Sequence, residues 1–222
     1  MKHHEDIIHR EDIMPLLRGV SHALAVPVAL AAAAILVAIA EPGPARAAAL
    51  VYGAGMCALF SGSALFHRLP CNASVRSLLA RIDHSAIYIF LAASYTPIAL
   101  LVLDDWERLT VLAIVWGGAL GGVALSVAWV TAPRLLFTIS YLLFGWVALI
   151  ASPRLFERME TTPLLLFLIG GLLYSAGAVV YAMKRPDPWP ETFGFHELFH
   201  ALVIAAAVTH FVAMAGWVIP AA

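Results

Sequence analysis

Two histidines, His196 and His200, lie four positions apart in an apolar stretch near the end of the chain. If that stretch is a helix, both imidazoles project from one face, a spacing that lets two of them bind one metal ion. An earlier apolar stretch carries Ser63 and His67 at the same spacing. The sequence therefore offers three imidazoles and a hydroxyl group on two helix faces.

These side chains can form one site only if the chain places them at one depth in a membrane. His67 ends the second predicted span, Asp83 begins the third, and His196 begins the seventh. Because successive spans alternate in direction, these three positions fall on the same side of the membrane. We therefore predict a zinc site at His67, His196 and His200, with a fourth position open for water.

Two further polar side chains accompany the predicted zinc site. Zinc lowers the pKa of a bound water to about 7, and a nearby carboxylate can orient that water or accept its proton. Asp83 is suited to this role. Ser63 lies one helical turn deeper than His67 and can hydrogen-bond the same water or a substrate carbonyl. We expect Asp83 and Ser63 to be the catalytic residues.

The composition shows what kind of chain positions these residues. Of the 222 residues, 62% are hydrophobic and 12% are charged, whereas soluble domains have about 45–50% and about 25%. The 13 basic and 14 acidic residues give a net charge of −1, so no basic surface for nucleic acid is expected. Cys57 and Cys71 are too few for a disulfide framework. We predict an all-α polytopic membrane protein, which excludes a soluble enzyme, a disordered chain and a nucleic-acid binder.

Seven apolar stretches approach or exceed the roughly 20 residues that a helix needs to cross a bilayer. Short connections join them, so we expect one seven-helix transmembrane domain over residues 19–219 after a short tail over residues 1–18. The first stretch is too long for the apolar core of a cleaved signal peptide and is predicted to remain a helix. The predicted spans are residues 19–40, 47–67, 82–103, 109–130, 135–152, 163–183 and 195–219, of which the fifth is the shortest.

Basic residues in the loops orient the predicted bundle. With a cytoplasmic N-terminus, nine Lys and Arg residues lie on the cytoplasmic side and four on the other side. We therefore predict a cytoplasmic N-terminus and an outside C-terminus, in a bacterial plasma (inner) membrane. Near the predicted span boundaries, three tryptophans are expected to anchor in the membrane interfaces: Trp106, Trp189 and Trp217. The sequence does not specify an oligomeric state.

Four more ionisable residues in the spans are secondary candidates for the site: His22, His84, Glu197 and His210. A single histidine in a membrane helix is often a hydrogen-bonded packing residue, and this alternative stays open for the three histidines. Residues 196–200 also match the HExxH pattern of metalloproteases, in which Glu197 would be the general base. No acidic residue follows His200 as a further ligand, which disfavours a protease. Capping the start of its helix is an equally natural role for Glu197.

Taken together, these motifs resemble the haemolysin III branch of the progestin and adipoQ receptor family. They are SALFH at residues 63–67, DHSAIY at residues 83–88 and GFHELFH at residues 194–200, with RGVSH at residues 18–22 resembling the bacterial version. The resemblance runs from residue 18 to about residue 217. It implies seven helices, a cytoplasmic N-terminus and a zinc ion near the cytoplasmic leaflet. The motifs match zinc ligands at His67, His196 and His200, with Asp83 and Ser63 around the metal-bound water.

The wider superfamily includes alkaline ceramidases, so the resemblance implies a zinc-dependent hydrolase of a lipid amide or ester, with a membrane lipid as substrate. In such a reaction zinc polarises the carbonyl, the activated water attacks, and Asp83 moves the proton. Two alternatives stay open. One is a non-enzymatic protein of membrane homeostasis or stress response with a structural zinc, and the other is a cytolytic protein, as the family name suggests.

Overall fold

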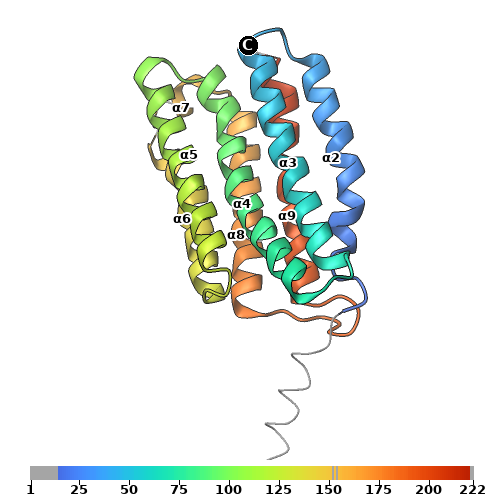
Figure 1. Ribbon diagram of the computed structural model, residues 1–222. Helices are drawn as coiled ribbons and strands as arrows, with labels where there is room; N and C mark the ends of the chain where they lie inside the picture. Colours follow the sequence, from blue (N-terminus) through green and yellow to red (C-terminus); the bar gives the residue numbers. More distant parts are fainter. Residues whose placement is uncertain (1–14, 152, 154, 221–222) are drawn as a thin grey trace, which may run out of the picture.

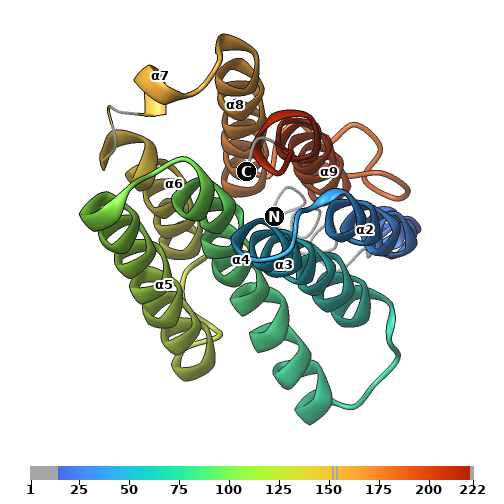
Figure 2. The ribbon, with the colours of Figure 1, turned by 90° about the horizontal axis from the view of Figure 1, so that it is seen from above.

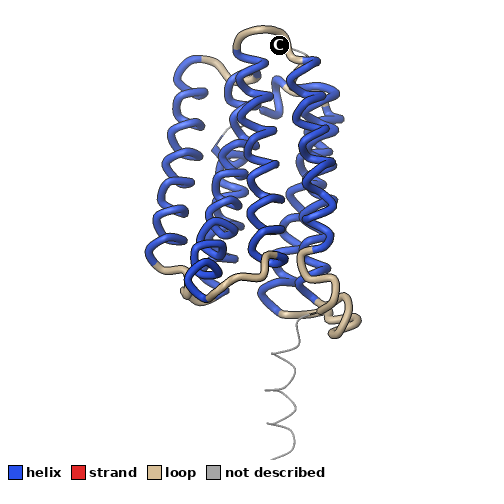
Figure 3. Tube along the Cα trace, turned by 45° about the vertical axis from the view of Figure 1, so that its right-hand side comes forward, coloured by secondary structure: helices blue, strands red, loops and turns tan. Residues whose placement is uncertain are grey.

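Long helices, nearly parallel and joined by short loops, make up the molecule (Figure 1). The computed structural model describes residues 15–151, 153 and 155–220. These residues contain no β-strand, apart from one isolated bridge between Trp189 and Phe193 in a loop (Figure 3). Most of the predicted tail, residues 1–14, lies outside the described residues, as does residue 152 of the fifth predicted span. The helices are α2 (Val20–Ile39), α3 (Pro44–Arg68), α4 (Ala73–Leu101), α5 (Asp105–Ala128), α6 (Arg134–Ala151), α7 (Leu155–Arg158), α8 (Thr161–Met183), α9 (Phe195–Ala213) and the π-helical turn η1 (Met214–Val218).

Six helices are long and apolar enough to cross a membrane, namely α2, α3, α4, α5, α8 and α9 continued by η1. The fifth predicted span is α6, which has 18 residues and whose described apolar part, Arg134–Trp146, is shorter than the others. The prediction of an all-α polytopic membrane bundle is confirmed. The side of the membrane that each terminus faces stays a prediction.

Two helices begin earlier than their apolar stretches. α4 begins at Ala73, because the Asn72 side chain accepts a hydrogen bond of 3.0 Å from the backbone N–H of Val75 and caps the helix there. α3 begins at Pro44, and proline is favoured in the first turn because its missing N–H has no partner there in any case. Hydropathy marks only the long apolar part of a helix, so the first turns of both helices lay outside the predicted spans.

Contacts between successive neighbours close six helices into a ring, which can be followed in Figure 2. α2 packs on α3, α3 on α4, α4 on α6, α6 on α8, α8 on α9, and α9 packs back on α2. α5 packs on α4 and α6 from outside this ring. The ring brings the end of α3 next to the start of α9, although these segments are far apart in the sequence.

Of the three tryptophans predicted as interfacial anchors, Trp106 and Trp217 lie near helix ends and Trp189 lies in the loop between α8 and α9. Trp106 and Trp189 are each 67% exposed. Trp217 is partly buried, and its indole N–H donates a hydrogen bond of 3.1 Å to Glu160 Oε2. An exposed indole near the end of the bundle suits an interfacial position, and this role stays a prediction.

Candidate metal and catalytic site

The structure brings the three predicted histidines together where the end of α3 meets the start of α9. One ring nitrogen from each of His67, His196 and His200 lies within 4.8 Å of the others. The Nε2 atoms of His67 and His196 are 3.2 Å apart. His67 and His200 are buried, and His196 is partly buried. These residues form the histidine cluster.

The histidine cluster has the chemistry and the spacing of a metal site. Two nitrogens bound at about 2.0–2.1 Å to one tetrahedral metal ion are about 3.4 Å apart, close to the observed separation of the two Nε2 atoms. Imidazoles are favoured ligands of several transition metals, so the cluster could hold a metal ion. The Nδ1 atom of His200 is buried and has no hydrogen-bond partner among the described residues.

Local structure at both helix ends positions the histidine cluster. At the start of α9, Glu197 Oε2 accepts a hydrogen bond of 2.9 Å from the backbone N–H of Gly194, which fixes the first turn that carries His196. On the other side, Gly19 precedes α2 with a φ of 73°, and a Cβ on it would lie 2.4 Å from the Cβ of His67. Only glycine allows the start of α2 to pack this closely against His67.

Asp83 and Ser63 lie on α4 and α3 and face each other. The Asp83 carboxyl group is in hydrogen-bond range of the Ser63 hydroxyl group. Both residues line the same internal cavity as His196 and His200. The structure thus places the predicted carboxylate and hydroxyl group beside the cavity at the end where the histidine cluster lies.

His22 is the secondary candidate nearest to the histidine cluster. Its ring stacks on that of His200, with centroids 3.8 Å apart and an angle of 11° between the planes. His22 is buried, and neither of its nitrogens makes a hydrogen bond of ordinary geometry to another described residue. His22 therefore packs directly on the histidine cluster but is not one of the three residues whose ring nitrogens converge there.

Glu197 has structural partners for both of its carboxylate oxygens. Oε1 makes an ion pair of 2.6 Å with Arg18 Nε, while Oε2 caps α9. Glu197 is 1% exposed and is not part of the cavity lining. These contacts favour the capping role over the role of general base in an HExxH protease.

The two other secondary candidates are not part of the histidine cluster, although both line the internal cavity. His84 lines the cavity and packs against Phe137, with ring centroids 4.8 Å apart. His210 lies 14 residues beyond His196, which is about 21 Å along α9. Its Nε2 atom is 3.2 Å from the carbonyl oxygen of Phe167 on α8. The structure therefore separates His210 from the histidine cluster.

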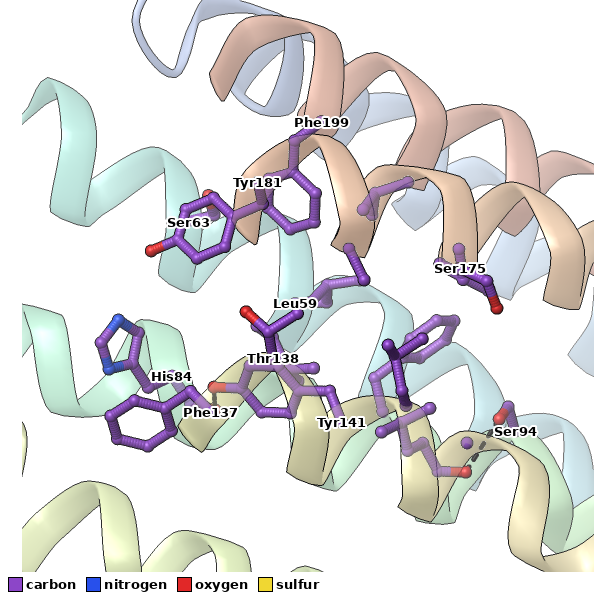
Figure 4. Close-up of a pocket in the computed structure, with 18 of the residues that line it drawn as sticks. Leu59, Ser63, His84, Ser94, Phe137, Thr138, Tyr141, Ser175, Tyr181 and Phe199 are labelled. Atoms are coloured by element: carbon purple, nitrogen blue, oxygen red, sulfur yellow. Dashed lines mark hydrogen bonds between the residues drawn. The ribbon is translucent and has the colours of Figure 1, made fainter. Parts of the chain in front are cut away.

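An elongated cavity of about 260 Å³ runs inside the ring of helices. All six ring helices line it, and α5 does not. Figure 4 shows Ser63 and His84 at one end of this cavity and Ser94 and Ser175 at the other. We call these ends the metal end and the distal end. Between them the lining is mainly apolar, as is typical of sites for apolar ligands.

Sequence reasoning missed two residues at the metal end. Arg134 served only as a loop charge for orientation, yet it lines the cavity, and its guanidinium carbon is 5.2 Å from the ring centroid of Tyr181. The Tyr181 ring lies 5.5 Å from the His196 ring. The only signal in the sequence was that Tyr181 lies within an apolar span. A buried phenol needs a polar neighbour, so this tyrosine could have indicated a polar site nearby.

Comparisons with known proteins give one consistent result. The sequence profile of a family described as "Haemolysin-III related" matches residues 12–211. The Hemolysin-3 homolog of Bacillus subtilis (strain 168) is 33% identical over 161 residues, covering 72% of each chain. Hemolysin-3 of Bacillus cereus is 32% identical over 172 residues, covering 78% of this chain and 75% of that protein. The human monocyte to macrophage differentiation factor is 27% identical over 208 residues, covering 87% of this chain and 80% of that protein.

Proposed function

Because the chain belongs to the haemolysin III-related family, we propose that it is a zinc-dependent membrane hydrolase of a lipid amide or ester. The observation that carries this proposal is the opening of the histidine cluster into an apolar cavity lined also by a carboxylate and a hydroxyl group. A purely structural metal site needs neither the cavity nor the carboxylate.

His67, His196 and His200 are the proposed zinc ligands. When bound, zinc supplies a Lewis acid and a water molecule that ionises near neutral pH. Asp83 accepts the proton of the attacking water and passes it to the leaving group. Ser63 lies beside Asp83 and has one hydroxyl hydrogen, which it donates either to the Asp83 carboxylate or to the substrate carbonyl.

The rest of the cavity suits the apolar part of a lipid. Side chains of Leu59, Ile87 and Leu91 line its middle section, so an acyl chain there is shielded from water. Five of the six helices that line the cavity are long and apolar enough to cross a membrane, so the cavity lies at the depth of the acyl chains. We place the protein in the bacterial plasma membrane with the histidine cluster near the cytoplasmic leaflet. The basic residues at that end, such as Arg68, support this orientation.

The test is release of a fatty acid by purified, zinc-loaded protein from a panel of lipid amides and esters. We expect turnover by the wild-type protein and a loss of about 100-fold to 10,000-fold in Asp83→Asn, the usual contribution of general acid–base catalysis. Zinc content should stay unchanged in this variant. The matched control is Asp104→Asn, because Asp104 is exposed and pairs with Arg158 near the opposite end of the bundle.

A zinc-loaded wild-type protein without turnover on the whole panel would contradict the hydrolase. One observation favours a second function in that case. The histidine cluster joins α3 to α9, so a bound metal ion would cross-link two helices that the loops do not connect. A structural zinc in a non-enzymatic protein of membrane homeostasis predicts that His67→Ala lowers the melting temperature sharply and that Asp83→Asn leaves the cellular phenotype unchanged.

The names of two bacterial relatives refer to haemolysis, and cytolysis stays a prediction for this chain. No feature of the residues that the structure describes favours it specifically. Lysis by the wild-type protein and by His67→Ala to the same extent would show that such an activity is independent of the histidine cluster.

A further inference from the structure

The distal end of the cavity is lined by polar side chains where an acyl chain alone would need none. These side chains belong to three ring helices, α4, α6 and α8, and they are Ser94, Tyr95, Trp146, Tyr174 and Ser175. Figure 4 shows Ser94 and Ser175 at this end, opposite Ser63 and His84. A hydroxyl group without a partner in an apolar interior is costly, so each of them should have a hydrogen bond.

Four of these five side chains do have a partner within the protein. Ser94 donates to the carbonyl of Leu91, and Tyr95 donates to the carbonyl of Gly145. The Trp146 N–H donates to Ser175 Oγ at 2.9 Å, and Ser175 in turn donates to a backbone carbonyl on its own helix.

Tyr174 is the exception. Its hydroxyl oxygen is buried and has no hydrogen-bond partner among the described residues, although the residue lines the cavity. The Tyr174 ring rests against His210, with centroids 5.5 Å apart. His210 is itself held by its contact with the Phe167 carbonyl and by the close approach of Gly170. The phenol therefore has a fixed ring and an unused donor.

We propose that Tyr174 forms a second polar subsite at the distal end, which binds a neutral oxygen carried far along the apolar chain of the ligand. The ligand is then an oxygenated acyl lipid, with its head group at the histidine cluster and a hydroxyl or keto oxygen at Tyr174. A neutral oxygen fits, because no Lys or Arg lines the distal end to balance a carboxylate. The inference rests on the proposed function only for the placement of the head group.

The spacing of the two ends sets where this oxygen lies. Ser94 follows Asp83 by eleven residues on α4, which corresponds to about 16 Å of helix. The hydroxyl group of 12-hydroxystearic acid lies about that far from its carboxyl group in an extended chain. In 2-hydroxystearic acid, the isomer of equal composition, the hydroxyl group stays next to the carboxyl group at the metal end.

The experiment is displacement of a fluorescent fatty acid from the purified full-length protein by stearic, 2-hydroxystearic and 12-hydroxystearic acid. We expect 12-hydroxystearic acid to bind about five-fold more tightly than the other two, the usual effect of one net hydrogen bond. Tyr174→Phe removes only the hydroxyl group and should make the affinities for 12-hydroxystearic and stearic acid equal.

Tyr88→Phe is the matched control, because it also removes the hydroxyl group of a buried tyrosine but Tyr88 does not line the cavity. This variant should keep the preference. Equal affinities in the wild-type protein would overturn the subsite and leave Tyr174 bonded to a water only. A preference that persists in Tyr174→Phe, or one that Tyr88→Phe also abolishes, would overturn it as well. Hydrolysis is not measured, so failure of the hydrolase and failure of the subsite remain distinguishable.

Discussion

The two ends of the cavity satisfy their polar side chains in opposite ways. At the metal end, buried nitrogens of His22, His84 and His200 have no hydrogen-bond partner among the described residues. At the distal end, Ser94, Tyr95 and Ser175 donate to backbone carbonyls, and Tyr174 alone keeps a free hydroxyl group. Helices can satisfy hydroxyl groups from their own carbonyls, whereas imidazole nitrogens without such partners are available to bind an ion.

This comparison predicts that the two ends respond differently to the loss of a histidine. His67→Ala removes one of three ligands from the metal end, so zinc affinity should fall at least about 100-fold. His210→Ala removes an imidazole of equal size near the distal end and should leave zinc affinity unchanged. Zinc titration of both purified variants measures the difference. Equal zinc affinity in the two variants would contradict the prediction that zinc binds at the metal end.

The loss of a hydroxyl group should also depend on the end at which it occurs. Ser63→Ala removes the partner of Asp83 and should lower turnover by roughly ten-fold or more, as expected for a hydrogen bond to a charged group. Ser94→Ala removes a hydroxyl group bonded to its own helix and should leave turnover within about two-fold of wild type. Steady-state rates on the best lipid of the panel give this ratio. A larger loss in Ser94→Ala than in Ser63→Ala would reverse the assignment of the catalytic end.

At the metal end, a substitution of Glu197 should lower the stability of the fold without lowering turnover. Glu197→Gln weakens the ion pair with Arg18, which is partly exposed, and we expect it to destabilise the fold by about 2 kcal/mol. Turnover per zinc-loaded molecule should change only slightly, because Glu197 does not line the cavity. Thermal unfolding and turnover of the same preparation test both statements. Loss of turnover at unchanged stability would instead restore Glu197 as a general base.

The smallest expected effect concerns the packing behind the distal end. Gly170→Ala would place a Cβ 2.2 Å from the His210 ring, and we expect a loss of about 1–2 kcal/mol in stability with unchanged zinc content. Gly121→Ala on α5 is the matched control, because no atom lies within 4 Å of its added Cβ. Thermal unfolding of the two variants should show a lower melting temperature for Gly170→Ala alone. A loss of zinc in Gly170→Ala would mean that the two ends are coupled.

The sequence predicted those parts of the fold and the site that depend on periodicity. Histidines four residues apart share a helix face, and alternating spans bring the end of α3 to the start of α9, so the proximity of His67 to His196 followed from counting. The start of α4 at Ala73 did not follow, because its first turns are polar and hydropathy does not detect them.

Other features of the site depend on packing between helices. The stacking of His22 on His200 depends on how the start of α2 packs between α3 and α9. Gly19 allows the close contact of this segment with His67 on α3, and no sequence pattern encodes that contact. The pairing of Glu197 with Arg18 joins residues 179 positions apart. The position of Arg134 beside the cavity could not be predicted either. Its guanidinium group packs on the ring of Tyr181, which lies on another helix.

The central claim is that the histidine cluster is an open catalytic zinc site at one end of a lipid cavity. Diffraction from crystals of the zinc-loaded protein, with data collected on both sides of the zinc absorption edge, tests it most directly. We predict one zinc peak bonded to nitrogens of His67, His196 and His200 at about 2.0–2.1 Å, with the remaining coordination position facing the cavity and not filled by a side chain. A fourth ligand from the protein, or no zinc peak at the cluster, would contradict the account.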